Sequence, residues 1–133
     1  MALYLAKTDP ETYSIDDLKR EGTTEWNGVR NPVAVNTIKR MKPGDTVIIY
    51  HSQRDAAVVG LGTVVSVPRP DKNDPRSWVV DIQYVQHAKR AVTLGEIKAS
   101  HAFDDWALVR QGRLSTMPAP PQFWTWLQKQ GAF

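Results

Sequence analysis

Residues 56–67 read AAVVGLGTVVSV, a run of small and β-branched side chains that contains two glycines. β-Branched residues favour strands, so this stretch predicts a β-strand. A glycine inside a strand indicates a bulge or a close approach of another backbone, and Gly60 and Gly62 stand two positions apart. We therefore expect a curved strand, which in turn predicts a bent or closed sheet.

Strands and short helices alternate on both sides of this stretch. Apolar or alternating patterns predict strands over residues 2–7, 46–50 and 77–85. Capping signals predict helices after Ser14 to about residue 21, after Asn31 to about residue 41, over 93–100 and over 120–131. We expect a short helical or irregular segment up to Trp106, and an extended arm over 108–118 with a turn at Gly112. The mixed order predicts an α+β fold.

Composition limits the possible classes of protein. The 133 residues suit a single domain, residues 1–133, and the 41% hydrophobic and 23% charged residues are typical of a soluble globular protein. No apolar run approaches the roughly 20 residues of a membrane span, and no secretory leader pattern occurs, so we expect a cytoplasmic protein. There is no cysteine, which excludes disulfides and thiolate chemistry. The net charge of +3 permits an anionic partner without requiring one.

The segment EWNGVRNPVAVN, residues 25–36, concentrates residues that suit ligand binding. The indole of Trp26 can stack on a flat ring, amides can read the edges of a base, and the helix that starts near Asn31 offers N–H groups to a phosphate. The other interpretation is that Trp26 covers the core and the asparagines cap turns and helix ends. The residues alone leave both interpretations open.

Signals for catalysis are weak. His51 and Ser52 directly follow the strand predicted over 46–50, and adjacent residues of a continued strand point to opposite faces, which excludes them as a base and its nucleophile. The histidines lack metal-ligand spacing, and the two glycines open no helix and so make no dinucleotide fingerprint. Lys7 and Glu25 are a candidate base and acid, although such residues are commonly surface groups. We therefore expect no enzyme, no metal and no cofactor.

Several segments together resemble the EVE domain family. They are LAKTDPETYSIDDLKREGTTEWNGVRN at 5–31, MKPGD at 41–45, YHS at 50–52, VGLGTVV at 59–65 and LVRQGRLSTMP at 108–118. The resemblance implies a PUA-like fold, in which a bent sheet closes into a pseudo-barrel with short peripheral helices. It also implies a nucleic-acid reader that accepts a flipped, modified base, with modified cytosine in DNA preferred and RNA as a further candidate.

Carried over by motif, the resemblance implies two sets of site residues. The base-binding set is Trp26, Asn27, Gly28, Val29, Asn31, Tyr50, His51, Ser52, Leu114 and Ser115. The phosphate-binding set is Lys7, Arg30, Arg110 and Arg113. The partner is nucleic acid that carries a modified base, no membrane is involved, and a monomer is expected.

The chain departs from the family motif WDGVRNYQARN. Asn27 replaces the acid, Pro32 and Val33 replace the aromatic residue and the amide, and Val35 replaces the arginine. Asn27 can still accept a hydrogen bond from an exocyclic amine, but without the strength that a charge adds. The alternative function is an amidohydrolase of the related ASCH type that acts on a modified nucleoside, with Lys7 and Glu25 as the reacting pair.

Overall fold

The computed structural model describes residues 2–133, and Met1 lies outside the described residues. The strands are β1 Leu3–Thr8, β2 Thr23–Trp26, β3 Thr46–His51, β4 Ala57–Val64, β5 Arg69–Pro70, β6 Trp78–Thr93 and β7 Thr116–Pro118. The helices are α1 Ile15–Glu21, α2 Pro32–Lys39, α3 Leu94–Ser100, α4 Ala107–Arg110 and α5 Pro121–Lys129. Among these helices none is long and apolar enough to cross a bilayer.

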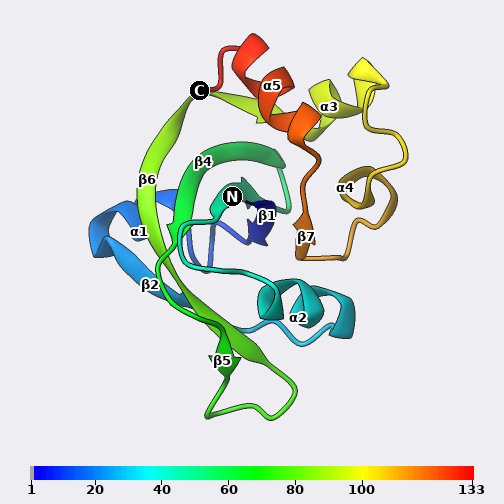
Figure 1. Cartoon of the computed structure of the whole chain (residues 1–133). Helices are drawn as coiled ribbons and strands as arrows, with labels where there is room; N and C mark the ends of the chain where they lie inside the picture. Colours follow the sequence, from blue (N-terminus) through cyan, green and yellow to red (C-terminus); the bar gives the residue numbers. More distant parts are fainter. Residues whose placement is uncertain (1) are drawn as a thin grey trace.

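The strands form one mixed sheet of seven that curls into an open, barrel-like shape (Figure 1). Along the sheet the order is β2, β6, β4, β3, β1, β7, and β5 pairs with β6. β1 runs parallel to β3, and the other pairs are antiparallel. β2 and β7 are therefore the two ends of the strand order. The curled sheet with its short helices confirms the PUA-like α+β fold that the resemblance implied.

The two glycines of β4 lie at bulges, as their place inside a strand predicts. The pairing of β4 with β6 shifts register between Val58 and Gly60 and again between Leu61 and Gly62. A Cβ on Gly60 would lie 2.7 Å from the carbonyl oxygen of Gln86, and one on Gly62 would lie 2.6 Å from Cγ2 of Ile82. Only glycine lets the neighbouring strand come this close, and the resulting bulges bend the sheet.

Local capping signals are confirmed at three helix starts. Ser14 and Asp17 form a reciprocal capping box on α1, and Thr93 and Glu96 form one on α3. The side chain of Asn31 accepts hydrogen bonds at the start of α2 from the N–H groups of its second and third residues, with Pro32 in the first turn. These caps satisfy N–H groups that have no partner inside the helix.

Four expectations differ from the structure. β2 was not predicted, because its sequence TTEW is polar apart from one residue. β6 extends over 16 residues, well past Val85, and β4 ends at Val64 before the predicted limit of 67. Residues 108–110 belong to α4 and not to an extended arm, because a helical turn begins after Trp106.

Candidate functional site

Three loops meet at one edge of the sheet because of the strand directions. β1 and β3 are parallel, so both end at this edge, and the antiparallel β7 begins there. The N–H of Lys7 donates to the carbonyl oxygen of Ser115 at 2.7 Å, and the N–H of Ser52 donates to that of Thr8 at 2.9 Å. Segments that are far apart in sequence therefore lie side by side.

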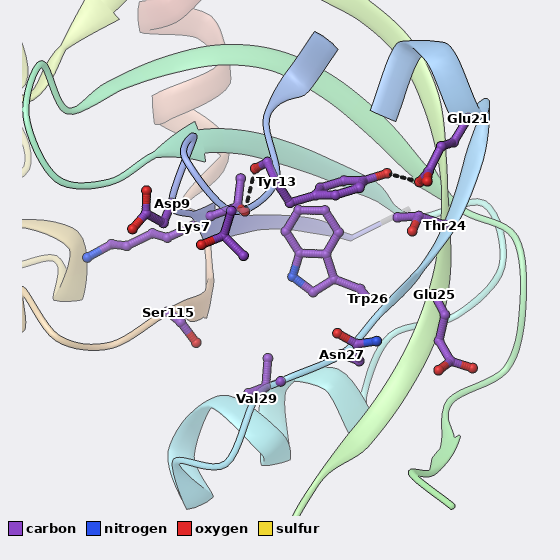
Figure 2. A pocket seen from close by; sticks show the side chains of 13 residues that line it. Lys7, Asp9, Tyr13, Glu21, Thr24, Glu25, Trp26, Asn27, Val29 and Ser115 are labelled. Atoms are coloured by element: carbon purple, nitrogen blue, oxygen red, sulfur yellow. Dashed lines mark hydrogen bonds between the residues drawn. The ribbon is translucent and has the colours of Figure 1, made fainter. Parts of the chain in front are cut away.

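A pocket of about 420 Å³ opens between this edge and β2. Its size falls within the range of about 300 to 1,000 Å³ that is usual for ligand sites. Figure 2 shows the side chains that line it, which come from the segment after β1, from β2 and the turn that follows it, and from Ser115 directly before β7. The lining residues are Lys7, Thr8, Asp9, Thr12, Tyr13, Glu21, Thr24, Glu25, Trp26, Asn27, Gly28, Val29 and Ser115.

Trp26 and Tyr13 form the aromatic wall of the pocket. Their rings meet edge to face, with centroids 6.2 Å apart and planes at 90°. The hydroxyl of Tyr13 donates to Oε1 of Glu21 at 2.5 Å, so α1 holds this ring in place. Burial is the largest cause that raises the pKa of Tyr13, and the hydrogen bond to Glu21 and the negative charge of Glu21 raise it further.

Trp26 is only 7% exposed and belongs to the hydrophobic core together with the buried Val29, which confirms the interpretation that Trp26 covers the core. Within residues 2–133 the indole N–H of Trp26 has no hydrogen-bond partner, and its nitrogen is not fully buried. In Figure 2 the nitrogen edge of the ring faces the side of the pocket where Ser115 and Val29 lie. Trp26 therefore offers the pocket a free donor at its edge more than an open ring face.

Asn27 and Gly28 form the turn that leads out of β2. Gly28 has φ +80°, a left-handed conformation that most residues avoid, so glycine suits this turn. The exposed side chain of Asn27 has no hydrogen-bond partner in the described part of the chain. Its amide is therefore free to donate to or accept from a ligand.

Lys7 supplies the cation of the pocket. Its Nζ donates to the carbonyl oxygen of Gly112 at 3.0 Å and lies 5.7 Å from the centre of the Tyr50 ring. Burial lowers the pKa of Lys7 and raises the pKa of Tyr50 to about 12. No carboxylate of residues 2–133 pairs with Lys7, so its charge is available to an anion at the pocket mouth.

The structure brings together six of the residues expected at the site. They are Lys7, Trp26, Asn27, Gly28, Val29 and Ser115. Sequence reasoning missed the part of the wall formed by Asp9, Thr12, Tyr13, Glu21 and Thr24. The motif segment at 5–31 contains all of these, but no local pattern indicates which of its side chains turn inward.

The YHS segment and Leu114 lie outside the pocket lining. Tyr50 is buried, and Nε2 of His51 accepts a hydrogen bond from the N–H of Ile15 at 3.0 Å, so the His51 ring links β3 to the start of α1. Burial lowers the pKa of His51. Ser52 is half-buried beside β1, and the buried Leu114 borders a separate hollow next to α2.

Two of the expected phosphate ligands already pair with carboxylates. Nε of Arg30 binds Asp74, and Nη1 of Arg110 lies 3.3 Å from Asp105. Asn31 uses its side chain to cap α2, which corresponds to the interpretation that the asparagines hold turns and helix ends. Arg113 has no ion pair among the described residues.

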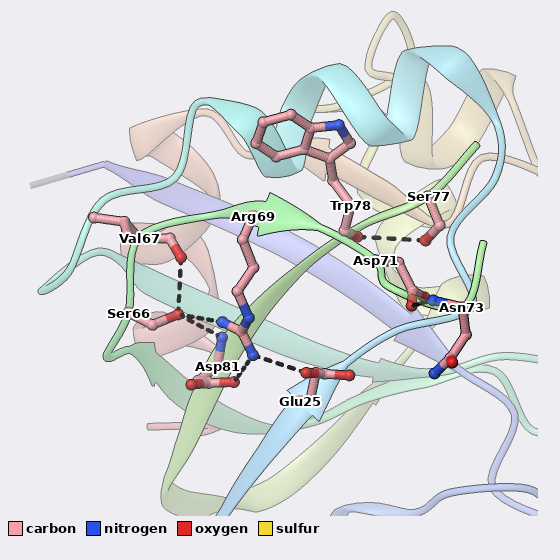
Figure 3. Close-up of polar contacts among 9 residues, drawn as sticks. All are labelled: Glu25, Ser66, Val67, Arg69, Asp71, Asn73, Ser77, Trp78 and Asp81. Carbon is pink, nitrogen blue, oxygen red and sulfur yellow. Dashed lines mark hydrogen bonds and ion pairs between the residues drawn. The ribbon is translucent and has the colours of Figure 1, made fainter. Parts of the chain in front are cut away.

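Glu25 borders the pocket but is held from the other side. Nη2 of Arg69 lies 2.8 Å from Oε2 of Glu25 and 2.9 Å from Oδ1 of Asp81 (Figure 3). Ser66 joins this network by accepting a hydrogen bond from Nη1 of Arg69. Arg69 thus neutralises Glu25 and links β2 to the β5–β6 hairpin, an arrangement that does not suit a free catalytic acid.

Comparisons with known proteins agree on one family. A sequence model described as "EVE domain" matches residues 2–130. Human thymocyte nuclear protein 1 is 34% identical over an alignment that covers 74% of this chain and 56% of that protein, so the chain spans about half the length of the curated relative.

Solved structures share the same architecture. A protein from Agrobacterium tumefaciens aligns with a TM-score of 0.94 at 31% identity over 100% of this chain and 94% of its own. Human THYN1 protein, solved in complex with DNA that contains 5-methylcytosine, aligns with a TM-score of 0.88 at 28% identity over 98% of both chains. An ASCH protein from Zymomonas mobilis aligns with a TM-score of 0.63 at 12% identity over 97% of this chain and 98% of its own, a likeness of fold alone.

Proposed function

The chain belongs to the EVE domain family, and on this premise we propose that it is a DNA reader that holds a modified cytosine, flipped out of the helix, in the pocket beside Trp26. The observation that carries the proposal is the combination of an aromatic wall with free hydrogen-bonding groups in that pocket. The human THYN1 structure with 5-methylcytosine DNA, which shares this fold along nearly the whole chain, supports the choice of ligand.

The free groups of the pocket match the edge of a cytosine. The indole N–H of Trp26 donates to a ring nitrogen or carbonyl oxygen, and the carbonyl of Asn27 accepts from the exocyclic amine. Lys7 at the pocket mouth attracts a phosphate of the flipped nucleotide. Flipping costs a few kcal/mol of lost stacking, which these contacts and the apolar wall offset.

A binding screen tests the proposal. The oligonucleotides are matched DNA and RNA, single and double stranded, with cytosine, 5-methylcytosine or 5-hydroxymethylcytosine at one central position. We expect tighter binding to a modified cytosine in DNA than to cytosine in the same sequence. Equal affinity for all cytosine forms would contradict a reader, and a preference for RNA would correct the polymer. Size-exclusion chromatography with light scattering tests the prediction of a monomer, and cellular fractionation tests that of a cytoplasmic location.

The alternative, an ASCH-type amidohydrolase, makes a different prediction. Such an enzyme releases an altered base or nucleoside from a free modified nucleoside, whereas a reader returns the base unchanged. Glu25 is bound to Arg69, which disfavours the proposed acid and base pair. Chromatography of modified nucleosides after long incubation with the protein separates the two functions.

A further inference from the structure

The turn between β3 and β4, residues 52–56, has an unusual backbone. Gln53 and Asp55 have φ values of +71° and +58°, in the left-handed region where residues other than glycine are uncommon. Such conformations cost free energy and persist where the surrounding structure imposes them, often at functional sites. Between these two residues stands Arg54, which is exposed at the tip of the turn.

This turn adjoins the mouth of the pocket. The N–H of Ser52 is bonded to the carbonyl oxygen of Thr8, directly before Asp9. Asp9 belongs to the lining of the pocket and also lines a hollow together with Gln53 and Arg54. Arg54 therefore shares a hollow with Asp9, a residue of the pocket lining.

Arg113 occupies the equivalent place on the other side of Lys7. It lies between Gly112, whose carbonyl oxygen accepts from Nζ of Lys7, and Ser115, whose carbonyl oxygen accepts from the N–H of Lys7. The order of strands β3, β1 and β7 places the turn with Arg54, the segment with Lys7 and the turn with Arg113 along one edge of the sheet.

Most arginines of the described chain are in ion pairs, whereas Arg54 and Arg113 are not. Carboxylates within 4.0 Å bind Arg20, Arg30, Arg69, Arg76, Arg90 and Arg110. In the part of the chain that the structure describes, no carboxylate pairs with Arg54 or Arg113, although Asp9 and Glu11 share the hollow of Arg54. Among residues 2–133 no carboxylate pairs with Arg40 either, but Arg40 borders the separate hollow beside α2.

From this geometry we infer that Arg54 and Arg113 form a clamp on the DNA backbone, with one arginine on each side of the pocket mouth and Lys7 between them. The inference rests on the proposed function and adds Arg54, which no motif indicated, to the contact surface. Guanidinium groups bind phosphate with two parallel hydrogen bonds, and such contacts position a duplex without reading its sequence. Arg54 is exposed at the tip of its turn and is therefore accessible to a phosphate.

The test compares Arg54→Ala and Arg113→Ala with Arg90→Ala, which removes the same charge from an arginine that is paired with Glu96 and bonded to the carbonyl oxygen of Gln130. Affinity for duplexes with cytosine and with 5-methylcytosine is measured at several salt concentrations. We expect each clamp variant to lose roughly three- to tenfold in affinity, and its slope of log K against log salt to fall by about 0.9, the value for one phosphate contact.

The loss must be equal for modified and unmodified DNA. Arg54→Lys, which keeps the charge but not the two parallel hydrogen bonds, must lose less affinity than Arg54→Ala. A loss for Arg54→Ala no larger than that for Arg90→Ala, or a loss confined to modified DNA, would overturn the clamp while the reader function stands. Wild-type protein that binds none of the duplexes overturns both proposals. Thermal unfolding of each variant confirms that the fold is kept.

Discussion

The ring of Tyr13 meets the indole of Trp26 edge to face at 90°, and the hydroxyl of Tyr13 is bonded to Glu21 on α1. The pocket wall is therefore part of the same packing that attaches α1 to the sheet. Trp26 therefore contributes to both stability and the pocket, and the effect of a substitution there on unfolding must be measured separately from its effect on binding.

Trp26→Ala should reduce the free energy of unfolding by about 3 to 5 kcal/mol, because it removes a large buried ring. The loss corresponds to the interpretation that Trp26 covers the core, one of the two that the sequence leaves open. Trp26→Phe keeps most of the apolar volume and removes the N–H, so we expect a smaller loss of stability and an affinity for modified DNA that is lower by about two- to tenfold. Urea unfolding and fluorescence anisotropy measure the two effects. Unchanged affinity in Trp26→Phe would exclude the N–H as a ligand donor.

Asn27→Asp should increase the preference for cytosine over thymine at the flipped position. The carboxylate accepts from the exocyclic amine of cytosine about twice as strongly as an amide oxygen does, and thymine has no such amine. We expect the ratio of affinities between 5-methylcytosine and thymine at the flipped position to rise about three- to tenfold, while stability changes by less than about 0.5 kcal/mol because the side chain is exposed. A ratio that stays the same would place Asn27 outside the base contact.

Arg69→Met should weaken DNA binding, although the side chain of Arg69 itself is not expected to contact DNA. It frees the negative charge of Glu25 beside the pocket and breaks two half-exposed ion pairs, each worth at most about 1 kcal/mol. We expect affinity to fall severalfold, and the double variant Arg69→Met with Glu25→Gln to recover it. If the double variant binds as weakly as the single one, Arg69 acts in some other way than by neutralising Glu25.

Acid should destabilise the fold through His51. Burial lowers the pKa of His51 in the folded protein below its ordinary value of 6.5, so the unfolded chain binds the proton more readily. The stability that the neutral ring contributes is present above about pH 6.5 and is lost as the pH falls from there toward the lower folded value. Asp16 and His87, which lie nearby, shift the pKa of His51 in opposite directions.

His51→Gln keeps a hydrogen-bond acceptor for the N–H of Ile15 and removes the titration. We expect its urea midpoint to change less than that of the wild type between pH 7.5 and 5.5, a window above the range where carboxylates titrate. Parallel curves for the two proteins would show that His51 does not carry the effect.

Gly60→Ala should destabilise the fold by about 1 to 3 kcal/mol, because the new methyl group overlaps the carbonyl oxygen of Gln86 and Cδ1 of Ile15. Gly95→Ala is the control within α3, where a Cβ meets only Oγ1 of Thr93 at 3.7 Å. Alanine favours a helix over glycine, so this variant should be as stable as the wild type or more stable by up to about 1 kcal/mol. Equal effects of the two substitutions would contradict the role of Gly60 in bending the sheet.

The sequence predicted what depends on local chemistry. The caps at Ser14, Asn31 and Thr93 are complete within four residues, and the bulges in β4 follow from its glycines. β2 could not be predicted in this way, because an edge strand with one buried side chain has no apolar alternation.

Motifs predicted the region of the site but not the role of each side chain. Lys7 and Ser115 meet in the pocket because β1 pairs with β7, a long-range contact that local spacing does not reveal. Trp26 reaches the same pocket from β2, at the other end of the strand order. His51 turns to α1 and Arg30 to Asp74, and both partners are distant in sequence. Arg54 has no motif at all, since only the three-dimensional turn places it beside the mouth.

The pairing of β1 with β7 joins Tyr4 to Pro118, near the two ends of the chain. A growing polypeptide that leaves the ribosome can form α1 and much of the sheet, but Ser115 reaches Lys7 only after almost the whole domain has been synthesised. Contacts between such distant residues form late because a long loop must first close. The side of the pocket that Ser115 forms, and the contact of Lys7 with Gly112, are therefore absent until nearly all of the domain has been synthesised, so a complete binding surface marks a complete domain.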